Sequence, residues 1–276
     1  MNRTMITATN TLSQLQLQMD MIGNNLANAQ TTAYKRKDGT FSELLVQQFN
    51  NQPREDKEKG RLTPNGIRQG VGAQLGLVKH IQTQGSIKVT GRPLDVAITK
   101  ENQYFKINVN GQIQYTRDGA FYLSPTGANQ VSLVTNNGDY LVDQNNQPIV
   151  INDDVKDISF RENGTLVVTS SNGATQSFQL GMVSVQNPQY LEHKQGNVVG
   201  LAENAAQLGI NEEDILTELT GALRQDISIQ QNALEASNVD MSKELTDLMN
   251  VQRQYQLQSR SITIADQMLG LINGVR

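Results

Sequence analysis

The hydrophobic positions at the N-terminus repeat with the spacing of a helix that packs along one narrow seam. Met5, Leu12, Met19 and Leu26 are seven residues apart, and Ala8, Leu15, Ile22 and Ala29 form a second row between them. Polar residues fill most other positions, and residues 1–22 contain neither Gly nor Pro. This heptad pattern predicts an amphipathic helix that weakens after Gly23 and ends within residues 31–34.

A longer row of the same spacing runs through the C-terminal part of the chain. Its members are Ile227, Leu234, Met241, Leu248, Tyr255, Ile262 and Leu269, and Leu245 widens the stripe. Because residues 222–269 contain no Gly or Pro, the pattern predicts one helix of roughly 45 residues. The sequence Ser237-Asn238-Val239-Asp240 is a candidate break or cap, since Asn and Asp side chains compete with helical hydrogen bonds.

A helix whose apolar side is only a seam needs a second helix to cover it. Two arrangements satisfy the pattern: a hairpin of the two terminal helices within one chain, or a bundle of helices from several copies. We expect Leu12, Leu15, Met19, Ile22 and Leu26 to pack against Leu248, Tyr255, Ile262 and Leu269 of the same or an adjacent subunit. The pattern does not choose between these arrangements.

The middle of the chain alternates with a period of two and is rich in hairpin-turn dipeptides. Asn65, Asn110, Asn137, Asn163 and Asn172 each precede Gly, as do Asp38 and Asp118. Asn-Gly favours the left-handed dihedral angles of a type I′ hairpin turn. Strands are therefore predicted within residues 104–109, 112–116, 131–135, 139–142, 158–160, 165–169 and 177–185.

These patterns together predict an α+β protein in which long N- and C-terminal helices pair as a coiled coil beside a central antiparallel all-β domain. The predicted divisions are residues 1–64 for the first helix and a linker, 65–205 for the β domain, and 206–276 for the C-terminal helix. Residues 53–66 mix charges of both signs with Pro and Gly, which is typical of a solvated linker.

Amide side chains dominate the polarity of the sequence. Asn and Gln number 27 and 31, whereas charged residues make up only 18% of the 276 residues. Neutral hydrogen-bonding groups suit extensive protein–protein contacts. A formal net charge of −4 gives no overall attraction for nucleic acid, and the basic run Lys35-Arg36-Lys37 suffices only to complement a helix end.

The sequence also lacks the residues of a catalytic or metal site. Cys is absent, so thiol catalysis, disulfides and cysteine-ligated metals are excluded. His80 and His193 have no partner at metal-binding spacing, and no nucleotide-binding or nucleophile-elbow motif occurs. Asp118 lies in an Asp-Gly turn, where a structural role is sufficient. We expect no enzyme activity, no metal and no cofactor.

No stretch approaches the run of about 18 apolar residues that a membrane span requires. The N-terminus also lacks the apolar core of a cleavable secretory signal. These features predict no membrane insertion and a cytoplasmic location, unless the protein leaves by a route that does not read such a signal.

Two terminal motifs resemble those of the axial rod and hook proteins of the bacterial flagellum. The N-terminal motif lies in residues 23–36, and its matching positions are Asn24, Asn25, Ala27, Asn28, Thr31, Tyr34 and Lys35. The C-terminal motif, L-E-x-S-N-V-D followed by Q-R-x-Y, is matched by Ser237, Asn238, Val239, Asp240, Gln252 and Arg253. Residues 90–98 and 115–121 resemble segments of the distal-rod and hook branches. Ala33 stands where the family signature has Gly.

The resemblance implies a structural subunit of the basal-body rod, most similar to the distal rod protein or its close rod paralogue. Such subunits pass through the type III export apparatus and polymerise outside the cytoplasmic membrane into a hollow helical tube. The tube transmits torque from motor to hook. The implied partners are the protein itself, other rod and hook proteins, the export apparatus, and ring proteins or cell wall around the rod.

Other functions remain open at the level of sequence. A hook or hook-junction protein of the same family is one. A flagellum-associated cell-wall-binding module is another, and Tyr104, Tyr115 and Tyr122 are its candidate aromatic residues. A wall hydrolase using Asp118 is a third.

Overall fold

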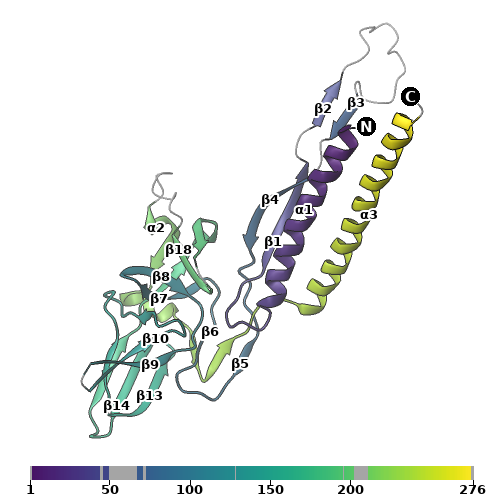
Figure 1. The fold of residues 1–276 in the computed structure, drawn as a ribbon. Helices are drawn as coiled ribbons and strands as arrows, with labels where there is room; N and C mark the ends of the chain where they lie inside the picture. Colours follow the sequence, from purple (N-terminus) through teal and green to yellow (C-terminus); the bar gives the residue numbers. More distant parts are fainter. Residues whose placement is uncertain are drawn as a thin grey trace. The chain divides into compact units, whose positions relative to one another are not determined.

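The computed structural model describes residues 2–43, 46–49, 67–70, 73–127, 129–194, 196–201 and 211–274 (Figure 1). The chain forms two compact units. A helical unit contains Met1–Ala27, Lys37–His80 and Asp240–Arg276, and a β unit contains Asn28–Arg36 and Ile81–Val239. Both units are therefore built from segments that are far apart in the sequence. The predicted divisions at 64/65 and 205/206, and the predicted linker 53–66, lie outside the described residues.

The helical unit contains two long antiparallel helices, with both ends of the chain at the same end of the pair (Figure 1). They are α1 (Asn2–Ala27) and α3 (Met241–Gly274). Strands β1 (Lys37–Glu43) and β4 (Ala73–His80) pair antiparallel and lie along α1, and β2 (Val46–Phe49) pairs with β3 (Ile67–Gly70). The sequence did not predict β1, and α1 ends before the predicted range 31–34.

The C-terminal helix begins much later than its heptad row predicted. Residues 221–235 instead form the 3₁₀ helix η3 and two strands, so the predicted helix over this segment is wrong. These strands pair with β5 (Ile87–Val89) and β6 (Val96–Ile98) in the β unit, and this tertiary pairing outweighs local helix propensity. The candidate cap is confirmed: the Asp240 carboxylate accepts hydrogen bonds from the Ser242 and Lys243 N–H groups.

All described strand pairs of the β unit are antiparallel. Its strands are β5 (Ile87–Val89), β6 (Val96–Ile98), β7 (Gln103–Val109), β8 (Gln112–Thr116), β9 (Tyr122–Gly127), β10 (Gln130–Val134), β11 (Tyr140–Leu141), β12 (Val150–Asn152), β13 (Val155–Arg161), β14 (Thr165–Ser170), β15 (Thr175–Gln179), β16 (Met182–Val185), β17 (Leu191–His193), β18 (Val198–Leu201), β19 (Leu216–Glu218), β20 (Ile229–Gln231) and β21 (Ala233–Glu235). Short helical turns are η2 (Pro188–Tyr190), α2 (Glu212–Ile215) and η3 (Gly221–Asp226).

The largest sheet follows the order β12-β10-β11-β7-β8-β18-β17, with β9 beside β10, β16 beside β7 and β19 beside β16. Strands β13, β14 and β15 form a second sheet. Between them lies an apolar core in which Phe105 and Phe121 meet edge to face, with ring centroids 5.2 Å apart. Alternate side chains of β14 are buried, which explains the period of two there, whereas consecutive side chains of β7 and β10 are buried because both faces of these strands are covered.

The predicted hairpins are confirmed. Strands β7 and β8 pair through the Asn110-Gly111 turn, where both residues have positive φ (52° and 86°), as a type I′ turn requires. Strands β10 and β11 also pair in the predicted region. The predicted strand 177–185 is two strands, β15 and β16, because the chain turns at Leu180-Gly181. A Cβ at Gly181 would lie 2.6 Å from the Asp143 carbonyl oxygen, so only Gly fits there.

Candidate assembly site

The seam between α1 and α3 forms within the chain. Leu15 and Ile22 of α1 are buried with Val251 of α3, and Met19, Leu248 and Tyr255 pack against them. The spacing of these residues places them on one face of each helix. The intramolecular hairpin is therefore present, and further copies are not needed to bury the centre of the seam.

The remaining predicted seam residues fall into three groups. Met5, Leu12, Leu26, Ile262 and Leu269 are half-buried on their helices. Met241 and Leu245 lie on α3 but are each 43% exposed, so they do not belong to the buried seam. Ile227 and Leu234 are not on the helix: Ile227 is in the core of the β unit and Leu234 is in β21. The seven-residue count could not detect that the helix starts only at Met241.

Asn25 of the N-terminal motif is buried and joins three segments of the helical unit through hydrogen bonds. Its Nδ2 donates to the Lys37 carbonyl oxygen and its Oδ1 accepts from the Lys37 N–H, both at 2.9 Å. Nδ2 also donates to Glu244 Oε2 on α3 at 3.2 Å. Asn25 and Glu244 are 0% and 1% exposed. One amide therefore ties α1 to the first strand and to α3, which explains why this position carries Asn.

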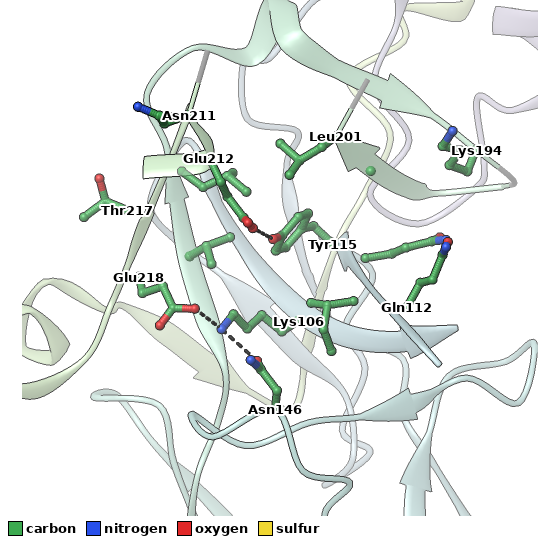
Figure 2. Close-up of a pocket in the computed structure, with 15 residues that line it drawn as sticks. Lys106, Gln112, Tyr115, Asn146, Lys194, Leu201, Asn211, Glu212, Thr217 and Glu218 are labelled. Carbon is green, nitrogen blue, oxygen red and sulfur yellow. Dashed lines mark hydrogen bonds and ion pairs between the residues drawn. The ribbon is translucent and has the colours of Figure 1, made fainter. Parts of the chain in front are cut away.

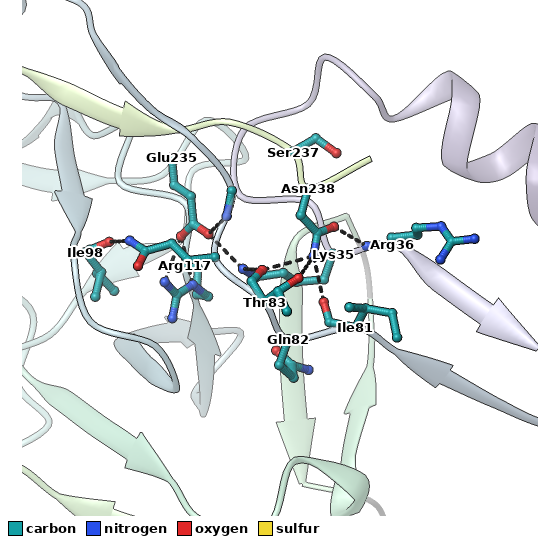
Figure 3. Close-up of polar contacts among 12 residues, drawn as sticks. Lys35, Arg36, Ile81, Gln82, Thr83, Ile98, Arg117, Glu235, Ser237 and Asn238 are labelled. Atoms are coloured by element: carbon teal, nitrogen blue, oxygen red, sulfur yellow. Dashed lines mark hydrogen bonds and ion pairs between the residues drawn. The ribbon is translucent and has the colours of Figure 1, made fainter. Parts of the chain in front are cut away.

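A buried charge cluster occupies the β unit where the two terminal motifs meet (Figure 3). Glu235 of β21 lies between Lys35 Nζ, 2.7 Å from its Oε1, and Arg117 Nη2, 2.8 Å from its Oε2. The side chains of Lys35, Arg117 and Glu235 are 4%, 2% and 0% exposed. The Gly85 N–H donates a further hydrogen bond to Glu235 Oε1. Pairing on both oxygens is what makes a buried carboxylate tolerable.

The cluster shifts the ionisation of its members. Burial raises the pKa of the Glu235 carboxyl, but the charges of Arg117 and Lys35 lower it more, so the net direction is down. Burial and the nearby Arg117 lower the pKa of the Lys35 ammonium. Burial also raises the pKa of Tyr104 to about 12, and the Arg117 guanidinium lies 5.6 Å from its ring centroid. Glu235 is therefore the anion that holds two cations in place.

Asn238 extends the junction between the terminal motifs. Its Oδ1 accepts a hydrogen bond from the Arg36 N–H at 2.7 Å, and its Nδ2 donates to the carbonyl oxygens of Ile81 and Thr83 (Figure 3). The Ala33 N–H donates to the Glu235 carbonyl oxygen at 2.8 Å. Residues 33–36, 81–85 and 235–238 are thus joined by main-chain and side-chain bonds. We call Lys35, Arg117, Glu235 and Asn238 the motif junction.

Ala33 has φ of 57°, in the left-handed region that Gly adopts without strain. This conformation explains why a Gly is expected before the buried Tyr34, and Ala33 keeps the turn despite its Cβ.

The other motif positions have local roles. Ala27 ends α1, and Thr31 donates to the Asn28 side chain through its hydroxyl group. The Ser237 hydroxyl accepts from the Val239 N–H. Asn24, Gln252 and Arg253 have exposed side chains.

A pocket of about 1220 Å³ lies in the β unit, apart from the motif junction (Figure 2). Its charged groups are already paired: Lys106 contacts Glu218 and Asn146, and the Tyr115 hydroxyl donates to Glu212 at 3.0 Å. These pairs connect β7, β8, α2 and β19. Of the three tyrosines proposed for a wall-binding surface, Tyr104 and Tyr115 are buried and Tyr122 is 41% exposed. The predicted aromatic surface is therefore wrong for Tyr104 and Tyr115.

Asp118, the candidate hydrolase residue, accepts a hydrogen bond from the Ala120 N–H, and burial raises its pKa. Among the described residues, no group of three or more acidic or His side chains is placed to hold a metal ion. None of the helices in the described part of the chain combines the length and apolar character needed to span a bilayer.

Comparison with known families matches three parts of the chain. Residues 5–35 match a profile described as flagella basal body rod protein, residues 98–169 one described as flagellar hook protein FlgE/F/G D1 domain, and residues 230–275 one described as flagellar basal body rod FlgEFG protein C-terminal. The flagellar hook-basal body complex protein FlhP of Bacillus subtilis is 49% identical, with all of both chains covered. The chain belongs to the flagellar basal-body rod and hook family.

Other members of the rod and hook family are similar over nearly the whole chain. The flagellar basal-body rod protein FlgG of Agrobacterium fabrum is 32% identical, covering 94% of this chain and 93% of its own. The FlgG of Bacillus subtilis is 30% identical, covering 98% and 97%. The family is structural rather than enzymatic. Each of its three matched segments contributes one member of the charge cluster: Lys35, Arg117 and Glu235.

Proposed function

We propose that this protein polymerises through its terminal helices into a hollow helical tube, as a subunit of the basal-body rod that transmits torque between motor and hook. The observation that carries the proposal is a second apolar face on α3. Leu257, Ile264, Met268 and Leu271 are 62%, 52%, 52% and 71% exposed. They are spaced by seven, four and three residues and so share one side of the helix.

This outer face is distinct from the seam that covers α1. Ile262 is half-buried and Ile264 is exposed, and two residues on a helix are about 200° apart. After the intramolecular pair has formed, α3 still presents these four apolar side chains to solvent. α1 likewise exposes Ile6 and Leu17, at 52% and 47%. Exposed apolar stripes of this kind mark interaction surfaces, and helices of neighbouring subunits would cover them.

The finer assignments form part of the same proposal. Similarity to several FlgG proteins over nearly the whole chain supports a distal-rod position, with a hook or hook-junction role as the alternative. We propose that the chain passes unfolded through the type III export apparatus and assembles outside the cytoplasmic membrane. The absence of Cys is compatible with threading, since no disulfide can close the chain. Other rod and hook proteins, and rings or cell wall around the rod, are the proposed partners.

A matched pair of substitutions on α3 tests the outer face. Ile264→Asp places a charge in the stripe, and Ser259→Asp places the same charge at an exposed polar position. Both purified monomers should keep their unfolding free energy within about 0.5 kcal/mol, because neither side chain is buried. In cells that lack the native copy, Ser259→Asp should restore swimming and complete basal bodies, whereas Ile264→Asp should be secreted but leave rods incomplete. Normal basal bodies with Ile264→Asp would refute the proposal.

A further inference from the structure

The Asn-Gly turns of the β unit have a structural role, and their Asn side chains are also susceptible to chemical modification. Asn110, Asn137, Asn163 and Asn172 precede Gly111, Gly138, Gly164 and Gly173, which have φ of 86°, 89°, 73° and 83°. Because Gly has no Cβ, its amide nitrogen can approach the side-chain carbon of the preceding Asn with little hindrance. Asn65 and Asn273 also precede Gly, and their side chains lie outside the described part of the structure.

The reaction at such a pair is deamidation. The Gly nitrogen, having lost its proton, bonds to Asn Cγ, the Cγ–Nδ2 bond breaks, and ammonia leaves with that proton. The resulting succinimide ring is then opened by water at either of its two carbonyl carbons. One opening gives Asp, and the other gives isoaspartate, whose main chain contains an extra carbon. The step needs no oxidant, reductant or enzyme, but it needs a Gly nitrogen free to attack.

In the folded protein, each of these Gly N–H groups is engaged as a hydrogen-bond donor. Gly138, Gly164 and Gly173 donate to the main-chain carbonyl oxygens of Thr135, Arg161 and Ser170 at 2.9–3.0 Å. These acceptors belong to the turns themselves, so releasing the nitrogen requires the turn to open. The Arg224 guanidinium additionally bonds the carbonyl oxygens of Asn163 and Gly164.

The turn at Asn110 is held differently. The Gly111 N–H donates to a side-chain atom, Oδ1 of Asn108, at 2.8 Å. A rotation of the half-buried Asn108 side chain frees the Gly111 nitrogen while β7 and β8 stay paired. We propose that Asn110 is the deamidation site of the folded protein, and that Asn137, Asn163 and Asn172 react only when their turns open.

Modification at Asn110 adds a negative charge at the tip of the β7–β8 hairpin. In its isoaspartate form it also lengthens the main chain at a turn whose dihedral angles fit a type I′ geometry. Folded copies would therefore accumulate the change at one hairpin with time, whereas unfolded chains would acquire it at all four positions.

Timed incubation of the full chain at neutral pH, followed by peptide mass spectrometry, tests this assignment. In the folded protein, the conversion should appear first at Asn110. In concentrated urea, the four positions should react at similar rates, because each is followed by Gly. Equal rates at the four positions in the folded chain would overturn the proposal.

Substitutions at Asn108 test whether its hydrogen bond to the Gly111 N–H, rather than general unfolding, limits the reaction at Asn110. Asn108→Ala removes the acceptor and should speed conversion at Asn110 about fivefold, which corresponds to about 1 kcal/mol, the net value of a typical hydrogen bond. The other three positions report folding in the same molecule and should keep their rates. Asn108→Asp keeps an acceptor oxygen and should not speed the reaction. No change with Asn108→Ala, or equal acceleration with Asn108→Asp, would refute the role of Asn108.

Discussion

Lys35 and Glu235 are 200 residues apart in the sequence, yet Lys35 Nζ lies 2.7 Å from Glu235 Oε1 inside the β unit. Lys35 belongs to the N-terminal motif, and Glu235 is the acidic residue of the C-terminal L-E-x-S-N-V-D motif. Arg117, from the middle of the chain, completes the cluster. The two terminal motifs therefore contribute to more than the helices. Each also supplies charged or amide side chains that bond to other segments inside the β unit.

Removing the central anion should destabilise the β unit strongly. Glu235→Gln leaves Lys35 and Arg117 buried without their counter-charge, and breaking a buried pair in this way costs about 3–5 kcal/mol. Urea unfolding of the purified chain measures the effect. The control is Glu192→Gln, because the side chains of Glu192 and its partner Lys194 are 54% and 32% exposed and exposed pairs contribute about 0–1 kcal/mol. Equal effects of the two substitutions would show that the motif junction is not a stabilising element.

The same carboxylate should make stability sensitive to acid. The pKa of Glu235 is lower in the folded chain than its ordinary value of 4.5, so the folded state binds this proton less tightly than the unfolded state. Ionised Glu235 therefore stabilises the fold above pH 4.5, and this contribution is lost as the pH falls through the lower folded pKa. The pKa of Lys35 is lowered from 10.5, so its titration increases the stability of the fold as the pH rises from the lower folded pKa towards 10.5.

The measurement is the unfolding free energy of the native chain and of Glu235→Gln as a function of pH. Their difference should be constant near neutrality and should shrink as the solution is acidified below about pH 4.5. A difference that stays the same into strong acid would contradict the assigned direction of the pKa shift.

Replacing Ala33 by Gly should stabilise the protein, although Ala→Gly usually does the opposite. Ala33 has φ of 57°, and a Cβ in the left-handed region costs about 1–2 kcal/mol. The greater flexibility of Gly in the unfolded chain offsets part of this gain, so a net stabilisation of up to about 1 kcal/mol is expected. Ala265→Gly within α3 is the control and should destabilise by about 1 kcal/mol. Thermal unfolding of both variants checks the opposite signs.

Two neighbouring leucines on α1 distinguish the inner seam from the exposed surface. Leu15 is 7% exposed and packs with Val251, whereas Leu17 is 47% exposed. Leu15→Ala should cost about 2–5 kcal/mol and reduce hydrogen-exchange protection around Val251. Leu17→Ala should change the stability of the isolated chain by about 0.5 kcal/mol or less. If both variants lost the same stability, Leu15 would not be buried between α1 and α3 in the isolated chain.

The patterns near the ends and the turns of the sequence determined much of the architecture. Heptad spacing identified the amphipathic helices, and Asn-Gly pairs located the hairpins, because these features depend on contacts between residues close in sequence. The family resemblance was also visible in the two motifs. The fold class is confirmed for the terminal helices and the central antiparallel domain, while supercoiling of the helix pair stays a prediction.

Only the tertiary structure decided what lies between residues 221 and 240. Ile227 and Leu234 continue the heptad row in the sequence, yet they belong to the β unit, because Ile227 is buried in its apolar core and Leu234 lies in β21, which pairs with β5. The burial of Lys35, Arg117 and Glu235 could not be predicted either. Charged residues look like surface residues in a sequence, and they become tolerable inside only when distant segments bring opposite charges within hydrogen-bonding distance.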